Sequence, residues 1–204
     1  MRDMARAAPG SRRDARRRRL DALSPILGAM TDADARAAAA FLRHTLATLA
    51  YRAEKVLRDV PPGFAGYRLG PATRTPQELV AHLGDLLEWA GSLADGGWTW
   101  QAAGSQSFEA DVARFFAALA RLDARLASAA PLGHPAEIVF QGPIADALTH
   151  VGQLALLRGH AGAPVRPESY GRAEITAGRV GRDQSAKRRE FDGDASARKP
   201  PAEA

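Results

Sequence analysis

Apolar side chains recur at alternating spacings of three and four residues in four segments of the chain, which predicts four amphipathic helices. We expect these helices over residues 32–59, 76–93, 107–129 and 142–158. Their inward-facing positions are Leu42, Leu46, Leu49, Ala53 and Val56; Leu79, His82, Leu86, Trp89 and Leu93; Val112, Phe115, Phe116, Leu119, Leu122 and Leu126; and Ile144, Ala147, Leu148, Val151 and Ala155. Because each apolar stripe must be buried against another helix, the pattern predicts an all-α protein built as a four-helix bundle.

Capping residues support these helix starts. Thr75 is followed by Pro76 at the first helical position and by Glu78 three residues after the cap, which is the signature of a capping box. Thr31 is placed to cap the first helix, and residues 61–63, two prolines and a glycine, end it. The helix starts are therefore predicted with some precision.

Two stretches between the helices differ from the rest. Residues 61–74 form a connection long enough to suggest either disorder or a functional loop. Residues 137–140 are the only β-leaning stretch and are too short to build a sheet. We expect the fourth helix to begin after them, with Pro143 in its first turn.

The chain has a net charge of +5, and the positive charge is concentrated at its two ends. Residues 1–20 contain eight arginines and two aspartates, and the stretch from 21 to 171 carries −3. A mildly acidic central region does not suggest a phosphate-binding surface. We expect a disordered basic arm over residues 1–30, a bundle over 31–170 and a mostly disordered tail over 171–204.

Two interpretations of the basic arm stay open. Its run of four arginines at 16–19 could contact nucleic acid or an anionic lipid surface. The interpretation we favour is a solvated tail, or leader sequence that precedes a true start at Met30. Nucleic acid is therefore not the partner we expect.

The residue types that are missing also limit the function. The chain has no cysteine, which excludes disulfides, thiolate metal sites and cysteine nucleophiles. No apolar run approaches the roughly 20 residues that a membrane span needs. The apolar stretch after the basic arm is short and interrupted, so a secretory signal is not expected. We predict a cytoplasmic protein without a membrane partner.

Three polar residues are candidates for a metal site. Asp146 and His150 are four residues apart on one face of the fourth helix, and His82 lies on the apolar stripe of the second. Near a bundle interior these groups need a partner, which could be a direct Asp–His hydrogen bond, water at the rim, or a metal ion. Two histidines and a carboxylate form a three-ligand set with open positions, as in catalytic zinc and in non-haem iron, nickel or manganese sites. An inward histidine can also be an ordinary core residue.

A family resemblance favours the metal. Residues 75–85 resemble the second helix of the DinB/YfiT-like superfamily, and residues 142–154, with the pattern His150-x-Gly152-Gln153, resemble its late helix. The resemblance covers roughly residues 33–170. It implies a DinB-like four-helix bundle, possible pairing into a homodimer, and a divalent metal held by His82, Asp146 and His150. The late-helix pair is usually His-x-x-x-His; the Asp-x-x-x-His form here is closer to the mycothiol-dependent maleylpyruvate isomerase branch, which uses Glu-x-x-x-His.

Three functional hypotheses stay open, and the first two of them follow from the resemblance. The first is a metal-dependent transferase or isomerase that uses a low-molecular-weight thiol, with zinc, nickel, manganese or iron as the metal and a small molecule as substrate. The second is a non-catalytic, stress-associated metal-binding protein of the same fold. The third, which rests on the basic arm and not on the resemblance, is nucleic-acid binding. No catalytic residue is identified.

Three further side chains have more than one interpretation. Gln153 could orient a metal ligand or simply line the rim of the site. Trp98 and Trp100 could shape the mouth of a pocket, form a dimer contact or cover the end of the bundle.

Overall fold

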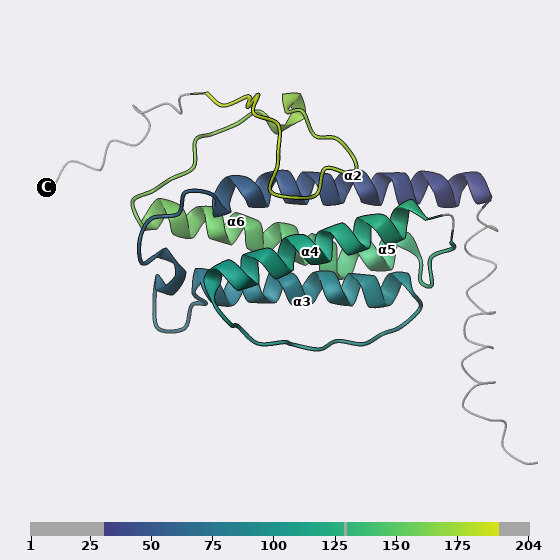
Figure 1. Cartoon of the computed structure of the whole chain (residues 1–204), viewed down its shortest axis with the longest axis horizontal. Helices are drawn as coiled ribbons and strands as arrows, with labels where there is room; N and C mark the ends of the chain where they lie inside the picture. Colours follow the sequence, from purple (N-terminus) through teal and green to yellow (C-terminus); the bar gives the residue numbers. More distant parts are fainter. Residues whose placement is uncertain (1–30, 129, 192–204) are drawn as a thin grey trace, which may run out of the picture. The chain divides into compact units, whose positions relative to one another are not determined.

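The computed structural model describes residues 31–128 and 130–191, and within these ranges the protein is all-helical, with no strand (Figure 1). Residues 1–37 and 38–204 are two compact units. The long helices are α2 (Asp32–Leu57), α3 (Pro76–Ala94), α4 (Phe108–Ala127) and α6 (Ala145–His160). Short elements are η1 (Phe64–Gly66), α5 (Ala136–Val139), the π-helical turn η2 (Phe140–Ile144) and η3 (Tyr170–Arg172). The prediction of four helices in a bundle is confirmed.

The four long helices share one hydrophobic core. Its buried members include Leu46 and Leu49 on α2, and Leu83 on α3. On α4 and α6 they include Phe115 and Leu154. Helix α3 packs chiefly against α4 and also contacts α6 and η2. This places α3 and α6, the two helices with the predicted ligands, in direct contact.

Both predicted N-caps are present. The side chain of Thr75 accepts a hydrogen bond from the backbone N of Glu78 at 3.2 Å, and Glu78 Oε2 accepts one from Thr75 N at 2.7 Å, which completes the capping box. In the first unit, Thr31 Oγ1 accepts a hydrogen bond from Asp34 N at 3.2 Å. The capping box fixes the first turn of α3, and therefore the position of His82 two turns later.

The start of the fourth helix differs from the prediction. Helical structure begins at residue 136, and α5 continues through the π-helical turn η2 into α6. Pro143 lies inside this turn and not at the first position of a helix. A wider turn accommodates a residue that cannot donate a backbone hydrogen bond, and such turns are frequent next to functional sites. The β-leaning residues 137–140 are helical, and Val139 is fully buried in the core.

The start of α6 lies close to α3. A Cβ atom added to Gly142 would come within 3.2 Å of the Trp89 ring on α3. Glycine at this position therefore lets the π-helical turn approach the tryptophan. Because Asp146 follows one turn later, this contact sets how near the carboxylate comes to α3.

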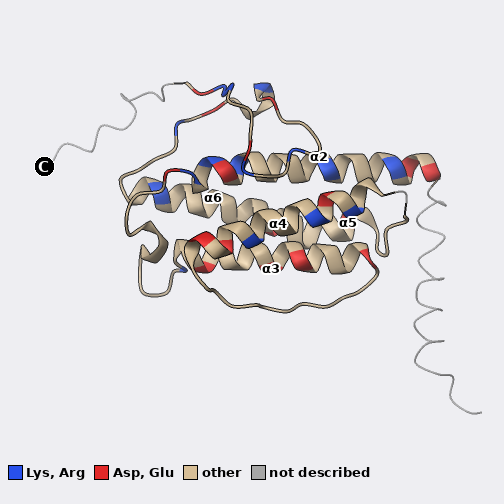
Figure 2. Cartoon of the chain, in the orientation of Figure 1, with Lys and Arg blue, Asp and Glu red and all other residues tan. Residues whose placement is uncertain are grey.

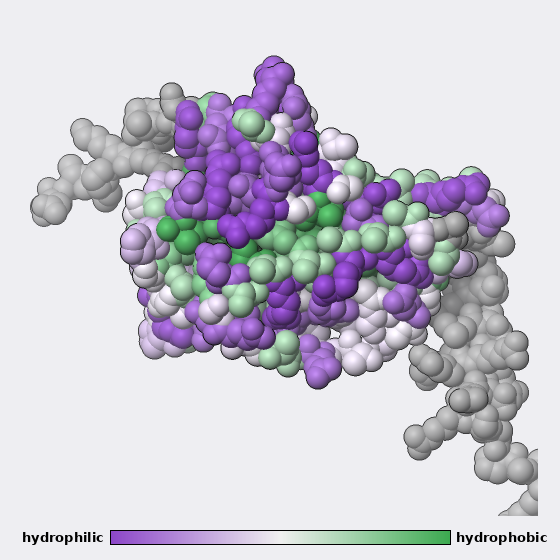
Figure 3. Space-filling model, in the orientation of Figure 1, coloured by the Kyte–Doolittle hydropathy of each residue, from purple (hydrophilic) through white to green (hydrophobic). Residues whose placement is uncertain are grey.

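Residues 167–191, which the sequence mostly assigned to a disordered tail, have a described placement and contact α2 through charged side chains. Lys55 Nζ donates to Glu168 Oε2 at 2.6 Å and pairs with Glu190 Oε1 at 2.9 Å, and Tyr51 Oη donates to Glu168 Oε1 at 2.5 Å. Lys55 and Glu168 are almost fully buried, with 1% and 0% of their side-chain surfaces exposed. The outer surface over this segment is largely hydrophilic (Figure 3), and its charged residues are drawn in Figure 2. Buried ion pairs hold this segment together with Val180, which lies in the hydrophobic core, and no periodic apolar stripe is involved.

The remaining predictions about the chain ends lie outside the described residues. These are the disordered basic arm with its four arginines, and the part of the tail from residue 192 onward.

Candidate metal centre

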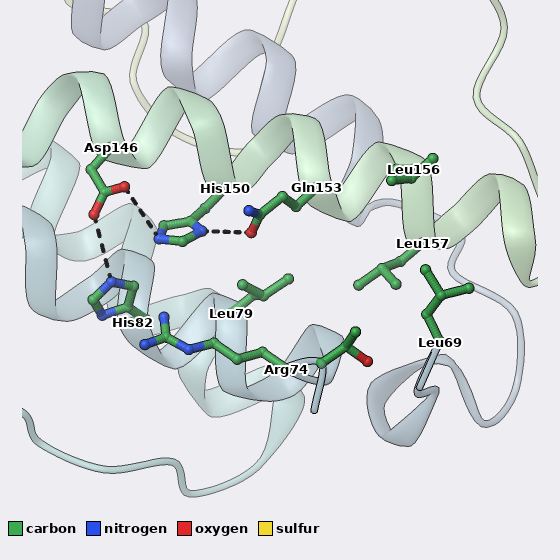
Figure 4. Close-up of a pocket in the computed structure, with 10 residues that line it drawn as sticks. Leu69, Arg74, Leu79, His82, Asp146, His150, Gln153, Leu156 and Leu157 are labelled. Carbon is green, nitrogen blue, oxygen red and sulfur yellow. Dashed lines mark hydrogen bonds and ion pairs between the residues drawn. The ribbon is translucent and has the colours of Figure 1, made fainter. Parts of the chain in front are cut away.

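The three predicted ligands meet at one point between α3 and α6. His82 extends from α3, and Asp146 and His150 extend from successive turns of α6 toward it (Figure 4). Each residue offers one ligand atom, and these atoms all lie within 4.8 Å of one another. The spacing of four residues therefore does place Asp146 and His150 on the same side of their helix.

The distances within the group argue against one of the alternatives that the sequence left open, the direct Asp–His hydrogen bond. Asp146 Oδ1 lies 3.4 Å from His150 Nε2, and Asp146 Oδ2 lies 3.7 Å from His82 Nε2. Both separations exceed the 2.7–3.2 Å range of an N–H···O hydrogen bond, so direct Asp–His bonds do not satisfy the group. Around a tetrahedral ion with bonds of about 2.0–2.1 Å, neighbouring ligand atoms lie roughly 3.3 Å apart. The two Asp–His separations are near that value, although each is measured from a different oxygen of Asp146, so the group could hold a single ion.

Gln153 holds the ring of His150 in this orientation. Its Oε1 atom lies 2.8 Å from His150 Nδ1, so Nδ1 is the nitrogen that carries the proton toward the amide oxygen. The other nitrogen, Nε2, faces Asp146 and is the atom that a neutral ring with this tautomer would offer to a metal. Of the two roles that the sequence left open for Gln153, the contact favours orientation of a ligand.

The surroundings of His82 favour its neutral form. Burial lowers the pKa of His82, the nearby positive charge of Arg74 and the ring of His150 act in the same direction, and Asp146 and Asp85 oppose them only partly. A neutral imidazole has the lone pair that a metal ligand needs. His82 and His150 expose 18% and 11% of their side chains, and Asp146 exposes 46%.

The tryptophans after α3 occupy different positions. Trp100 packs edge-on against His82, with 5.6 Å between ring centroids, and also against Trp89 at 5.8 Å. Trp98 instead packs against His134 at 5.0 Å. Trp100 therefore shields one side of the candidate site, while Trp98 lies against the loop before α5.

A pocket of about 520 Å³ opens beside the three ligands. Its lining includes the ligands themselves together with Leu69, Thr73, Arg74, Leu79, Gln153, Leu156 and Leu157 (Figure 4). The sequence indicated no role for Leu69, Thr73 or Arg74, which belong to the long connection between α2 and α3. Only the unusual length of that connection pointed to function.

The site is thus a set of two imidazoles and a carboxylate at the wall of a partly apolar pocket. In the part of the chain that the structure covers, no helix has both the length and the apolar character to span a membrane. Comparison of the chain with protein-family models, with curated proteins and with solved structures gives no match.

Proposed function

We propose that this protein binds a divalent metal ion through His82, Asp146 and His150 and uses it to act on a small molecule in the adjoining pocket. The observation that carries the proposal is the convergence of three ligand atoms within 4.8 Å of one another, with Asp–His separations too long for hydrogen bonds. The geometry suits an ion better than it suits a polar cluster satisfied by its own members.

The donor set fits such an ion. Two imidazoles and one carboxylate are ligands that zinc, iron, nickel and manganese accept, and three protein ligands leave further coordination positions open. Asp146 is one methylene shorter than the glutamate of the branch that the sequence most resembles. Its two oxygens nevertheless approach both histidines, because the π-helical turn and Gly142 bring the start of α6 close to α3.

The open side of the group suggests catalysis and not metal storage. The ligands line a pocket with room for a small molecule, whereas a purely structural metal is enclosed by four protein ligands. When bound, a divalent ion would act as a Lewis acid that polarises a substrate or lowers the pKa of a bound thiol. Since the chain has no cysteine, any such thiol comes from solution. We therefore propose transfer or isomerisation with a low-molecular-weight thiol, as the DinB-like resemblance implies.

Metal content of the purified full chain tests the binding step. We expect about one ion per chain by mass spectrometry, and at least a tenfold loss of affinity in His82→Ala and in His150→Ala. His44→Ala is the matched control, because His44 is an exposed histidine on α2 away from the group. Equal metal content in all four proteins contradicts the proposal.

A second measurement separates catalysis from simple binding. The metal-loaded chain is supplied with a low-molecular-weight thiol and an electrophile, and loss of the free thiol is followed. Turnover that disappears in the two histidine variants supports the enzyme. Full metal loading without turnover of any thiol favours the non-catalytic alternative. Contact with nucleic acid through the basic arm stays a separate prediction.

A further inference from the structure

Arg74 lines the same pocket, and it has no counterion among residues 31–128 and 130–191. Figure 4 shows its guanidinium group directed toward His82. Among the residues described, none forms a hydrogen bond or an ion pair with it. Its neighbour Arg68, by contrast, bonds to Glu78 and to the backbone oxygen of Thr73. Arg74 is thus a positive charge that the fold itself does not neutralise.

The acidic groups nearby are committed elsewhere. Asp85 lies one turn from His82, but its Oδ1 accepts a hydrogen bond from Arg114 Nη1 at 2.7 Å. Glu78 is held by Arg68 and by the capping box. Asp146 faces the two histidines. Asp146 is the carboxylate among the residues that line the pocket. With a divalent ion bound, the positive charges of the ion and of Arg74 would exceed the negative charge of Asp146, so the pocket would attract an anion.

The rest of the lining is apolar. Leu79 and Leu157 form a buried wall, and Leu69 and Leu156 are exposed at the pocket although they are large hydrophobic residues. Apolar surface beside a few convergent polar groups is typical of sites for small organic molecules. A ligand with an apolar body would cover these leucines while its polar end meets the charged groups.

We propose that the pocket binds a small organic anion, whose carboxylate or phosphate group contacts Arg74 beside the metal and whose apolar body lies along Leu69, Leu79, Leu156 and Leu157. A guanidinium group suits this role because it presents two parallel N–H donors to either head group. The inference rests on the proposed metal site, since the ion supplies much of the positive charge. It adds a substrate class to the proposed function and identifies Arg74 as the residue that selects it.

Calorimetric titration of the metal-loaded full chain tests this assignment. The probes are hexanoate, hexyl phosphate and hexanol, which share an apolar chain and differ in the head group. We expect at least one anion to bind tighter than hexanol, and to lose about tenfold or more in affinity in Arg74→Ala. The anion affinity of Arg74→Lys should lie between those of the unmodified chain and Arg74→Ala, because lysine keeps the charge but not the paired donors. The preferred anion identifies the head group.

Two measurements keep the outcomes separate. Arg121→Ala is the matched control, since Arg121 is an exposed arginine paired with Glu88 outside the pocket. Metal affinity of Arg74→Ala should equal or exceed that of the unmodified chain, because a nearby positive charge is removed. If the ion binds but Arg74→Ala leaves anion affinity unchanged, or if hexanol binds as well as both anions, the inference is wrong and the metal site stands. If the chain binds no metal, the proposed function is wrong. Anion affinity is then compared between the metal-free unmodified chain and metal-free Arg74→Ala, and equal affinities overturn the inference as well.

Discussion

At the scale of single residues, the carboxylate of Asp146 connects two helices that otherwise present their histidines separately. Each of its oxygens faces a different imidazole, one from α3 and one from its own helix. The two imidazole rings also pack edge to face, with 4.9 Å between their centroids. A small rotation of any one of the three side chains would change its separations from both of the others, so groups that hold the rings should affect metal affinity.

Gln153 provides a direct test of that expectation. Gln153→Ala removes the hydrogen bond to His150 Nδ1 without touching a ligand atom, so the ring is free to rotate. We expect metal affinity to fall about tenfold, which is the lower end of the range for residues that hydrogen-bond to a metal ligand and orient it. Competition with a chelating dye measures the change. Gln184→Ala is the control, since the Gln184 amide bonds to carbonyls of its own segment; an equal fall in both variants would contradict the role.

How far single residues could be predicted depends on where they lie in the chain. Helical spacing put Asp146 and His150 on one face and His82 on an inward stripe, and the family resemblance then joined the three as a ligand set. Gln153 lies on the same helix as the late pair, and its contact with His150 favours one of its two predicted roles. Arg74 could not be found in this way, because the direction of a loop side chain depends on the path of the loop and not on a repeat.

At the scale of elements, the two helices that supply the ligands start in different ways. Helix α3 starts at a capping box that the sequence shows in full, so its start was predicted correctly. Helix α6 is entered through α5 and a π-helical turn, so continuous helical structure begins at residue 136, six residues before the predicted start at 142. A proline after a glycine is typical of a helix start. The residues next to Gly142 and Pro143 give no sequence signal that a helix already precedes them.

The capping box should matter for stability because it sets the first turn of α3. Thr75→Ala removes the side-chain acceptor for Glu78 N, and we expect the free energy of unfolding to fall by about 1 kcal/mol. Urea denaturation followed by circular dichroism measures it. Thr48→Ala is the control, because the Thr48 hydroxyl donates to the carbonyl of His44 within α2, and its loss should cost less than about 0.5 kcal/mol. Similar losses in the two variants would argue against the cap.

At the scale of the molecule, the segment after α6 is attached to α2 by buried charges. The sequence analysis found no periodic apolar pattern there, and for that reason it assigned the segment to a tail. Periodicity detects helices and strands that bury a stripe, but it cannot detect an irregular segment held by Lys55, Glu168 and Glu190. Burial of Tyr51, followed by its bond to Glu168, raises the pKa of Tyr51 to about 12.

This buried cluster predicts a pH dependence of stability. Burial by itself would raise the pKa of Glu168, but bonds from Lys55, Tyr51 and the backbone of Arg189 outweigh it, so the pKa lies below the ordinary value of 4.5. A depressed carboxyl pKa stabilises the fold above pH 4.5, and this stabilisation is lost as the pH falls through the lowered value. We expect the free energy of unfolding to decrease with acidification in this range. Urea melts between pH 3 and pH 7 (roughly the span of this titration) measure it.

Lys55→Met tests whether that cluster is the origin of the effect. Leaving Glu168 buried without its partner should cost about 3 kcal/mol near neutral pH and flatten the acid dependence. Lys187→Met is the control, because Lys187 forms an exposed pair with Glu174 whose loss should cost less than about 1 kcal/mol. An unchanged acid dependence in Lys55→Met would show that other carboxylates dominate.

The glycine at residue 142 has a consequence for the approach of Asp146 to the two histidines. A methyl group there would act as a spacer between η2 and the Trp89 ring, which would have to yield by a few tenths of an ångström. Any displacement of η2 would reach the next turn, which carries Asp146. With the proposed ion bound, the side-chain size at this single position, away from the ligands themselves, would therefore change the spacing of the ligands.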